Sequence, residues 1–175
     1  MSSIGLIFST LVLLKGSDLS FTVGASTLPL VAFSFHIDAL SAFFIFTISL
    51  IALLCSVYAI GYVKHYYKKY NIGGLGFFYN ILILSLILIV SASNALFFLV
   101  VWEIMAIASY FIVVYDHKDK DNVKAGLLYF TMTYVGTALI LFGFLLIYKY
   151  IGSFDFEKIQ EGIALVPSAT KDIVF

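Results

Sequence analysis

Four long apolar stretches dominate this 175-residue chain. A helix rises about 1.5 Å per residue and the hydrocarbon core of a bilayer is about 30 Å thick, so roughly 20 apolar residues span it. The stretches that reach this length are residues 39–63, 75–93, 95–115 and 125–148. Only 11% of the residues are charged, against about 25% in soluble domains. The sequence therefore predicts an all-α polytopic membrane protein with four full transmembrane helices, forming a single bundle over residues 1–175.

Three shorter segments complete the expected fold. Residues 4–14 are apolar but cover only about half a bilayer, which predicts a partial helix. Apolar and polar residues alternate over residues 18–37, which predicts a short extramembrane β-hairpin that turns through residues 24–29. Residues 153–162 have the pattern of an amphipathic helix at the membrane surface. The apolar runs at both ends are incomplete, so we expect the chain to be part of a longer protein.

The lysines give an orientation. Six lysines fall in the two loops at residues 64–74 and 116–124, and four fall on the opposite side. The six are Lys64, Lys68, Lys69, Lys118, Lys120 and Lys124, and the four are Lys15, Lys149, Lys158 and Lys171. Because loops rich in lysine and arginine stay in the cytoplasm, we expect the two loops there.

Several classes of function are excluded by composition. The net charge is zero and there is no arginine, so no basic surface is available for nucleic acid. Cys55 is the only cysteine, and the three histidines have no ligand spacing. No nucleotide-binding loop or other cofactor motif is present. We therefore expect no metal, no cofactor and no redox centre in this chain.

Glu103 is the one charged residue near the middle of an apolar stretch. Such a carboxylate costs about 3 kcal/mol to insert, and ionisable residues at this depth usually face the protein interior and relay protons or bind ions. The small side chain of Ala106 and the ring of Tyr110 share its helical face, which favours contact with another helix. The alternative is a structural role for Glu103, with a hydrogen bond to a neighbouring helix.

Other polar residues have competing interpretations. Lys124 opens the last stretch and either marks the headgroup level or lies buried. Asp38 is expected to cap the first full helix, with His36 near enough to pair with it or with water. Tyr134 and Gly136 belong to a polar, small-residue patch in the last stretch, which serves helix packing or holds water on a proton path.

Three longer segments carry a family resemblance. Residues 35–63 contain IDALSAF, residues 76–114 contain WE followed by SYF, and residues 124–146 begin with KAGLLYF. These segments resemble the antiporter-like membrane subunits of complex I and of membrane-bound hydrogenases. Within that family they are most similar to hydrogenase-4 component B, the formate hydrogenlyase membrane subunit.

The resemblance implies roles for individual residues. Glu103 would be the carboxylate of the proton path, with Trp102 and Tyr110 as its neighbours in the motif, and its partner would be a lysine on a later helix. Lys124 and Tyr134 match positions on the same path, and Asp38 matches an acid at the start of its helix. Members of the family have about fourteen spans built as inverted repeats, so this chain would be an N-terminal portion.

The implied function is that of a proton-translocating subunit of a hydrogenase-4, formate hydrogenlyase or NADH dehydrogenase (complex I) type oxidoreductase. The subunit would lie in a prokaryotic cell (inner) membrane, with lipid and the other membrane and peripheral subunits as partners, and would carry H⁺ or Na⁺. Two alternatives remain open at this point. The chain could belong to a multisubunit Na⁺/H⁺ antiporter, or it could be a membrane scaffold that transports nothing.

Overall fold

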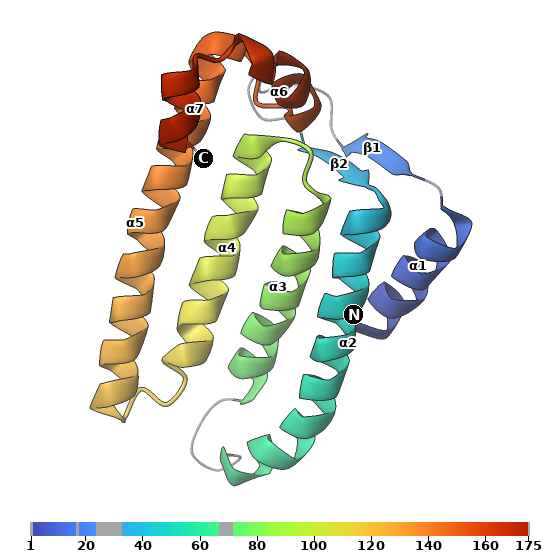
Figure 1. Ribbon diagram of the computed structural model, residues 1–175. Helices are drawn as coiled ribbons and strands as arrows, with labels where there is room; N and C mark the ends of the chain where they lie inside the picture. Colours follow the sequence, from blue (N-terminus) through green and yellow to red (C-terminus); the bar gives the residue numbers. More distant parts are fainter. Residues whose placement is uncertain (1, 17, 24–32, 67–71, 175) are drawn as a thin grey trace.

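The computed structural model describes residues 2–16, 18–23, 33–66 and 72–174 of the chain (Figure 1). The elements in order are α1 (Ser2–Lys15), β1 (Leu19–Val23), β2 (Phe33–Ile37), α2 (Ala39–Tyr62), the 3₁₀ turn η1 (Val63–Tyr66), α3 (Ile72–Ser91), α4 (Ala95–Val113), α5 (Lys120–Ile151), α6 (Phe156–Gly162), the 3₁₀ turn η2 (Ile163–Leu165) and α7 (Ser168–Val174). Within these residues, α2, α3, α4 and α5 are long and apolar enough to cross a membrane. The predicted fold class is confirmed.

The ends of the helices differ from the apolar stretches that predicted them. Helix α3 begins at Ile72 rather than at residue 75, and α4 ends at Val113. Helix α5 has 32 residues, which gives it a length of about 48 Å. That length exceeds the hydrocarbon thickness, so α5 continues into the polar interface at both ends. Hydropathy marks only the part of a helix that lies in lipid, whereas capping sets where the helix begins and ends.

Polar side chains cap the start of α2, α4 and α5, and a glycine ends α5. The Asp38 carboxylate accepts a hydrogen bond from Ser41 N at 2.7 Å at the start of α2. Asn94 caps α4, and Asp119 caps α5. Gly152 has a φ of 73°, the left-handed conformation that closes α5 and that side chains other than glycine's disfavour.

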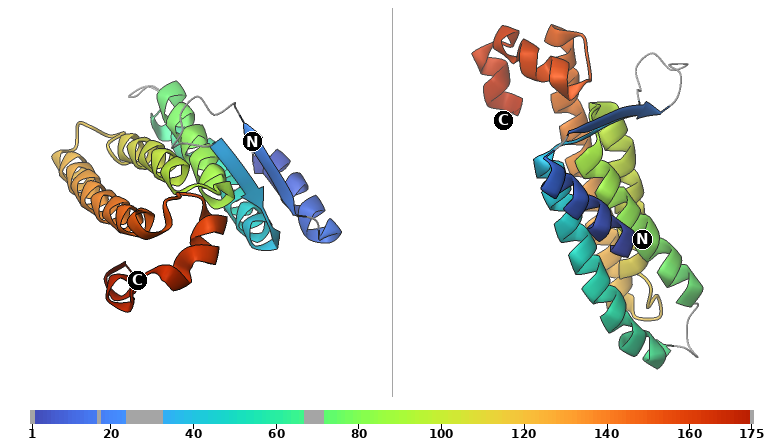
Figure 2. Two further views of the ribbon diagram at one scale, coloured as in Figure 1. Left: turned by 90° about the horizontal axis from the view of Figure 1, so that it is seen from above. Right: turned by 90° about the vertical axis from the view of Figure 1, so that its right-hand side faces the viewer.

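The five helices from α1 to α5 stand in a row, each beside the next in the sequence (Figures 1 and 2). Seen along the helix axes, the row is one helix thick (Figure 2, left). Between 11% and 28% of the residues in the apolar window of each spanning helix are buried. Helices that are apolar all round suit a lipid environment, so both broad faces of the row are open to lipid or to other protein segments.

One end of the row is held together by residues 92–94. The hairpin pairs Leu19 with Ile37 and Val23 with Phe33 in antiparallel register. Ser93 N donates to Ser34 O at 3.1 Å, which joins the hairpin to the loop before α4. The predicted turn at residues 24–29 lies outside the described residues. The segment before α6 and the start of α6 are attached to the same end of α4, because Ala95 N donates to Phe154 O at 2.8 Å and Phe156 N donates to Ser93 O at 3.0 Å.

The predicted lysine loops share one end of the row. The α2–α3 and α4–α5 connections both emerge there, opposite the hairpin and α6 (Figure 1). Lys64, Lys118, Lys120 and Lys124 are therefore at one end, while Lys68 and Lys69 lie outside the described residues. Which side of the membrane this end faces stays a prediction.

Candidate functional site

The face of α4 that meets α5 is a single ridge of residues spaced four apart. Its members are Phe98, Trp102, Ala106 and Tyr110, and Val114 continues the ridge directly after the end of α4. Residues at this spacing lie one above the other on a helix. The ring of Tyr110 is 5.5 Å from the ring of Phe130, and the ring of Phe98 is 6.4 Å from that of Phe144. These two contacts, far apart along the helices, fix how α4 and α5 are aligned.

The alignment places Thr137 at the level of Glu103. The line of contact between α4 and α5 is called the seam below. Because the two helices are antiparallel, moving a number of residues toward the N-terminus of α4 matches moving the same number toward the C-terminus of α5. Glu103 lies seven residues before Tyr110, and Thr137 lies seven residues after the Phe130 that Tyr110 contacts. Seven residues are close to two turns, so Glu103 also lies on the same side of α4 as Tyr110. The carboxylate therefore belongs to the side of α4 that faces α5.

Glu103 is half-buried in the middle of α4. Among the residues that the structure describes, no hydrogen bond or ion pair reaches its carboxylate. A carboxylate in this position needs donors or a cation to remain charged. No such group contacts the carboxylate among the described residues.

Threonines line the side of α5 that faces α4. The hydroxyl of Thr137 donates to Thr133 O at 3.0 Å, and that of Thr133 donates to Tyr129 O at 2.9 Å. Both side chains are half-buried, whereas Thr131, with the same kind of bond to Leu127 O, is exposed. A hydroxyl that donates its hydrogen bond to a backbone carbonyl can still accept hydrogen bonds through its lone pairs. Thr133 and Thr137 can therefore accept hydrogen bonds in the seam.

Trp102 contributes a buried hydrogen-bond donor. Its indole Nε1 is buried, and it meets no acceptor in the part of the chain that the structure describes. The indole lies 5.7 Å from the ring of Phe98, centroid to centroid. Ala106, one turn further along the ridge, is buried and small. The seam thus combines a buried donor, a carboxylate and the Thr137 acceptor close to one level of α4 and α5, with the Thr133 acceptor one turn away.

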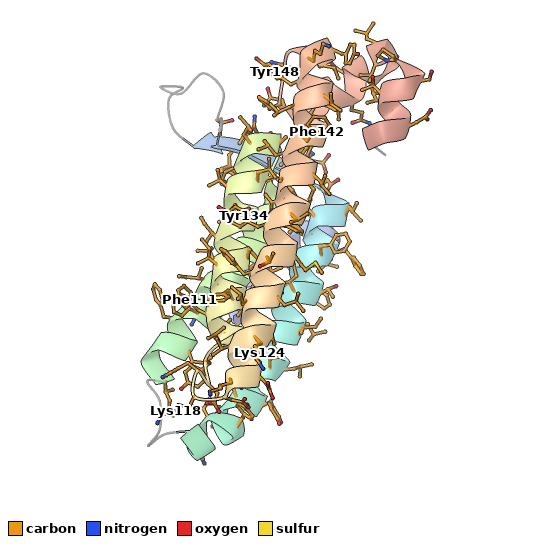
Figure 3. The ribbon with its side chains drawn as sticks, turned by 90° about the vertical axis from the view of Figure 1, so that its left-hand side faces the viewer. Phe111, Lys118, Lys124, Tyr134, Phe142 and Tyr148 are labelled. Carbon is orange, nitrogen blue, oxygen red and sulfur yellow. The ribbon has the colours of Figure 1, made fainter. Side chains whose placement is uncertain are left out.

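Lys124 lies far from this level. It sits near the loop end of α5, its side chain is 78% exposed, and it pairs with Asp121 on the same helix at 3.5 Å (Figure 3). Thirteen residues separate Lys124 from Thr137, which is about 20 Å along the helix. The structure therefore does not bring Lys124 and Glu103 together.

Tyr134 and Gly136 belong to a different part of the α5 surface from Thr133 and Thr137. Tyr134 lies midway along α5 and is exposed, with its ring 5.3 Å from that of Phe130 (Figure 3). A side chain on Gly136 would meet no described atom within 4 Å. The roles expected for both residues stay predictions, and they concern a surface that no described residue covers.

Asp38 and His36 lie at the hairpin end. The hydrogen bonds from Ser41 to the Asp38 carboxylate lower its pKa, and the nearby His36 adds to that effect. His36 is exposed on β2. Both residues line an open cavity of about 760 Å³, together with Asp155 and Lys158. They are separated from Glu103 by several helical turns.

Family models match most of the chain. Residues 91–173 match the family described as NADH:quinone oxidoreductase/Mrp antiporter, TM, and residues 26–71 match NADH-Ubiquinone oxidoreductase (complex I), chain 5 N-terminus. The chain belongs to the antiporter-like membrane subunit family. It is accordingly an integral, multi-pass membrane protein, and both helices of the candidate site lie in the first matched region.

Individual relatives agree with this assignment. The antiporter-like chain is 38% identical to hydrogenase-4 component B of Escherichia coli K12, with 71% of the chain and 18% of the relative covered. It is 31% identical to the antiporter subunit mnhA2 of Staphylococcus saprophyticus, with 85% and 18% covered. The chain thus spans about a fifth of the length of these relatives. It also superposes on the membrane-bound sulfane sulfur reductase, an archaeal respiratory complex, with a TM-score of 0.82 at 16% identity, covering 99% of the chain and 35% of that structure.

Two residues of this antiporter-like chain were missed by sequence reasoning. A side chain on Gly126 would overlap Val114 Cγ2, so Gly126 marks a close approach of α5 to the C-terminal end of α4. Asn94 is buried and joins the start of α4 to Asp155 at 3.0 Å. Asn before an apolar run is a helix-capping signal and could have been used. Nothing in the sequence pattern distinguishes Gly126 from Gly136.

Proposed function

We propose that this antiporter-like subunit carries protons through the membrane, with Glu103 as the carboxylate of the path, in a hydrogenase-4, formate hydrogenlyase or NADH dehydrogenase type complex. The observation that carries the proposal is the half-buried Glu103 carboxylate, which has no polar partner among the described residues. Burial favours the neutral form of a carboxylate, and a cation nearby favours the charged form. A group between these two influences takes up a proton and releases it as the cation moves.

The partner of Glu103 is proposed to be a lysine on a later helix of a longer protein. Lys124, near the loop end of α5, is exposed and about 20 Å away along the seam. The relatives are several times longer than this chain, which leaves ample sequence for such a helix. The other membrane and peripheral subunits of the complex would supply the redox energy, since the sequence of this chain contains no recognisable motif for a redox centre.

The test is Glu103→Gln in the native complex, purified from its source and reconstituted in liposomes. Glutamine keeps the shape and removes the proton-binding charge, so coupled proton uptake, followed with a pH-sensitive dye, should fall about a hundredfold. Glu161→Gln, on the exposed face of α6, is the matched control and should leave uptake unchanged. Normal proton uptake by Glu103→Gln would overturn the proposal.

A second candidate is a subunit of a multisubunit Na⁺/H⁺ antiporter, which the Staphylococcus saprophyticus relative favours. Under this alternative, proton movement in the same liposomes depends on Na⁺ and continues without an electron donor. A scaffold without transport gives a third pattern. Glu103→Gln then lowers the yield or the thermal stability of the complex and has no separate effect on ion movement.

A further inference from the structure

The groups at the level of Glu103 do not satisfy one another's hydrogen-bonding needs. The Trp102 indole N–H can only donate a hydrogen bond, and the Glu103 carboxylate in its charged form can only accept one. The Thr137 hydroxyl already donates its proton to Thr133 O. The indole nitrogen is buried, yet neither the carboxylate nor the hydroxyl accepts a hydrogen bond from it. An unpaired donor in a membrane interior is costly, because no bulk water is available there.

One member of the α4 ridge beside these groups has a small side chain. Ala106 is the small member of the α4 ridge, and it lies between the bulky Trp102 and Tyr110. Trp102 and Glu103 are adjacent in the sequence and lie on either side of the direction in which Ala106 points. The residue of α5 at the level of Glu103 is Thr137, through the alignment that Tyr110 and Phe130 set.

We propose that the α4–α5 seam binds an ordered water molecule that accepts a hydrogen bond from Trp102 Nε1 and donates to Thr137 Oγ1 and to the Glu103 carboxylate. Water is the one small ligand with both donors and acceptors in the number that these three groups require. Trp102 is then a positioning residue, because it holds the water and does not itself carry a proton. The consequence for transport rests on the proposed function, since the water is the first proton donor and acceptor next to Glu103.

The site can be tested directly because the chain has a single tryptophan. The full chain, labelled with ¹⁵N at the indole, is placed in lipid nanodiscs and studied by water-edited solid-state NMR. Magnetisation from water should reach Trp102 Nε1 severalfold faster than it reaches the backbone amides of Ala106 and Ala108, which are buried in the same helix. Transfer to the indole as slow as to those amides would overturn the water site.

Threonine variants test where the water lies. Thr137→Val removes the proposed acceptor and should slow the transfer to Trp102 severalfold, and Thr137→Ser should restore it. Thr131→Val is the matched control, because Thr131 makes the same bond to its own helix but is exposed. Unchanged transfer in Thr137→Val, or equal loss in Thr131→Val, would overturn the assigned position. None of these readouts measures transport. The water site can therefore be refuted while Glu103 remains the proton carrier, and the role of Glu103 can be refuted while the water site stands.

Discussion

Asp38 illustrates how one residue sets both local structure and a dependence on pH. Its carboxylate accepts the hydrogen bond from Ser41 N that starts α2, and this bond lowers its pKa below the ordinary value. A carboxyl group whose pKa is lower in the folded than in the unfolded state stabilises the fold at pH values above its unfolded pKa. That contribution is lost as the pH falls through the folded pKa.

Replacing Asp38 should therefore have a pH-dependent cost. Asp38→Ala removes the cap and should lower the free energy of unfolding by about 1 kcal/mol near pH 7. The difference between Asp38→Ala and the native chain should shrink below about pH 4, where the carboxyl group protonates. Thermal unfolding in mild detergent from pH 3 to 7 measures this.

Asp38→Asn provides the control for that prediction. Asparagine caps helices about as well as aspartate but does not titrate. It should keep most of the stability at pH 7, and the native chain should approach it on acidification. A difference between Asp38→Ala and the native chain that is constant with pH would contradict the role of the charge.

At the level of elements, the sequence predicts which helices form better than how they align. The four spans follow from the length of the apolar runs, because each run must bury its backbone polar groups in lipid. The rarity of a charge at mid-membrane singles out Glu103 in the same way. The separation of Glu103 from Lys124 depends instead on the register of α4 and α5, which Tyr110, Phe130 and Gly126 set by packing. Apolar patterns do not encode that register.

Gly126 should be the sensitive position of the α4–α5 seam. A Cβ at this position overlaps Val114 Cγ2, so Gly126→Ala should destabilise the fold by about 1–3 kcal/mol. Gly136→Ala, on the same helix with open space, should be neutral or slightly stabilising, because alanine favours helix over glycine. Thermal unfolding of both variants in detergent measures the difference.

A second substitution checks the cause of the Gly126 effect. Val114→Ala removes the overlapping methyl groups, so it should recover most of the stability that Gly126→Ala loses. Equal effects of Gly126→Ala and Gly136→Ala, or no recovery with Val114→Ala, would show that α4 and α5 are not aligned as described.

The whole molecule is an open row that is joined across one end. Each helix from α1 to α5 packs on its sequence neighbours, so the broad faces contribute little to holding the row together. The loop at residues 92–94 connects the hairpin on one side with the segment before α6 on the other. This loop leads directly into α4, the helix that carries Glu103. The contacts at this end of the row therefore position α4.

The bond between Asn94 and Asp155 should therefore couple distant parts of the chain. The Asn94 amide donates to the Asp155 carboxylate at 3.0 Å while its oxygen caps α4. Asn94→Ser keeps a capping oxygen and removes the amide donor. Its cost should be smaller when Asp155 is already alanine, with a coupling of about 0.5–3 kcal/mol in a double-mutant cycle of unfolding free energies. Strictly additive effects would mean that α6 and α4 are held by backbone bonds alone, and that the end of the row does not depend on this side-chain pair.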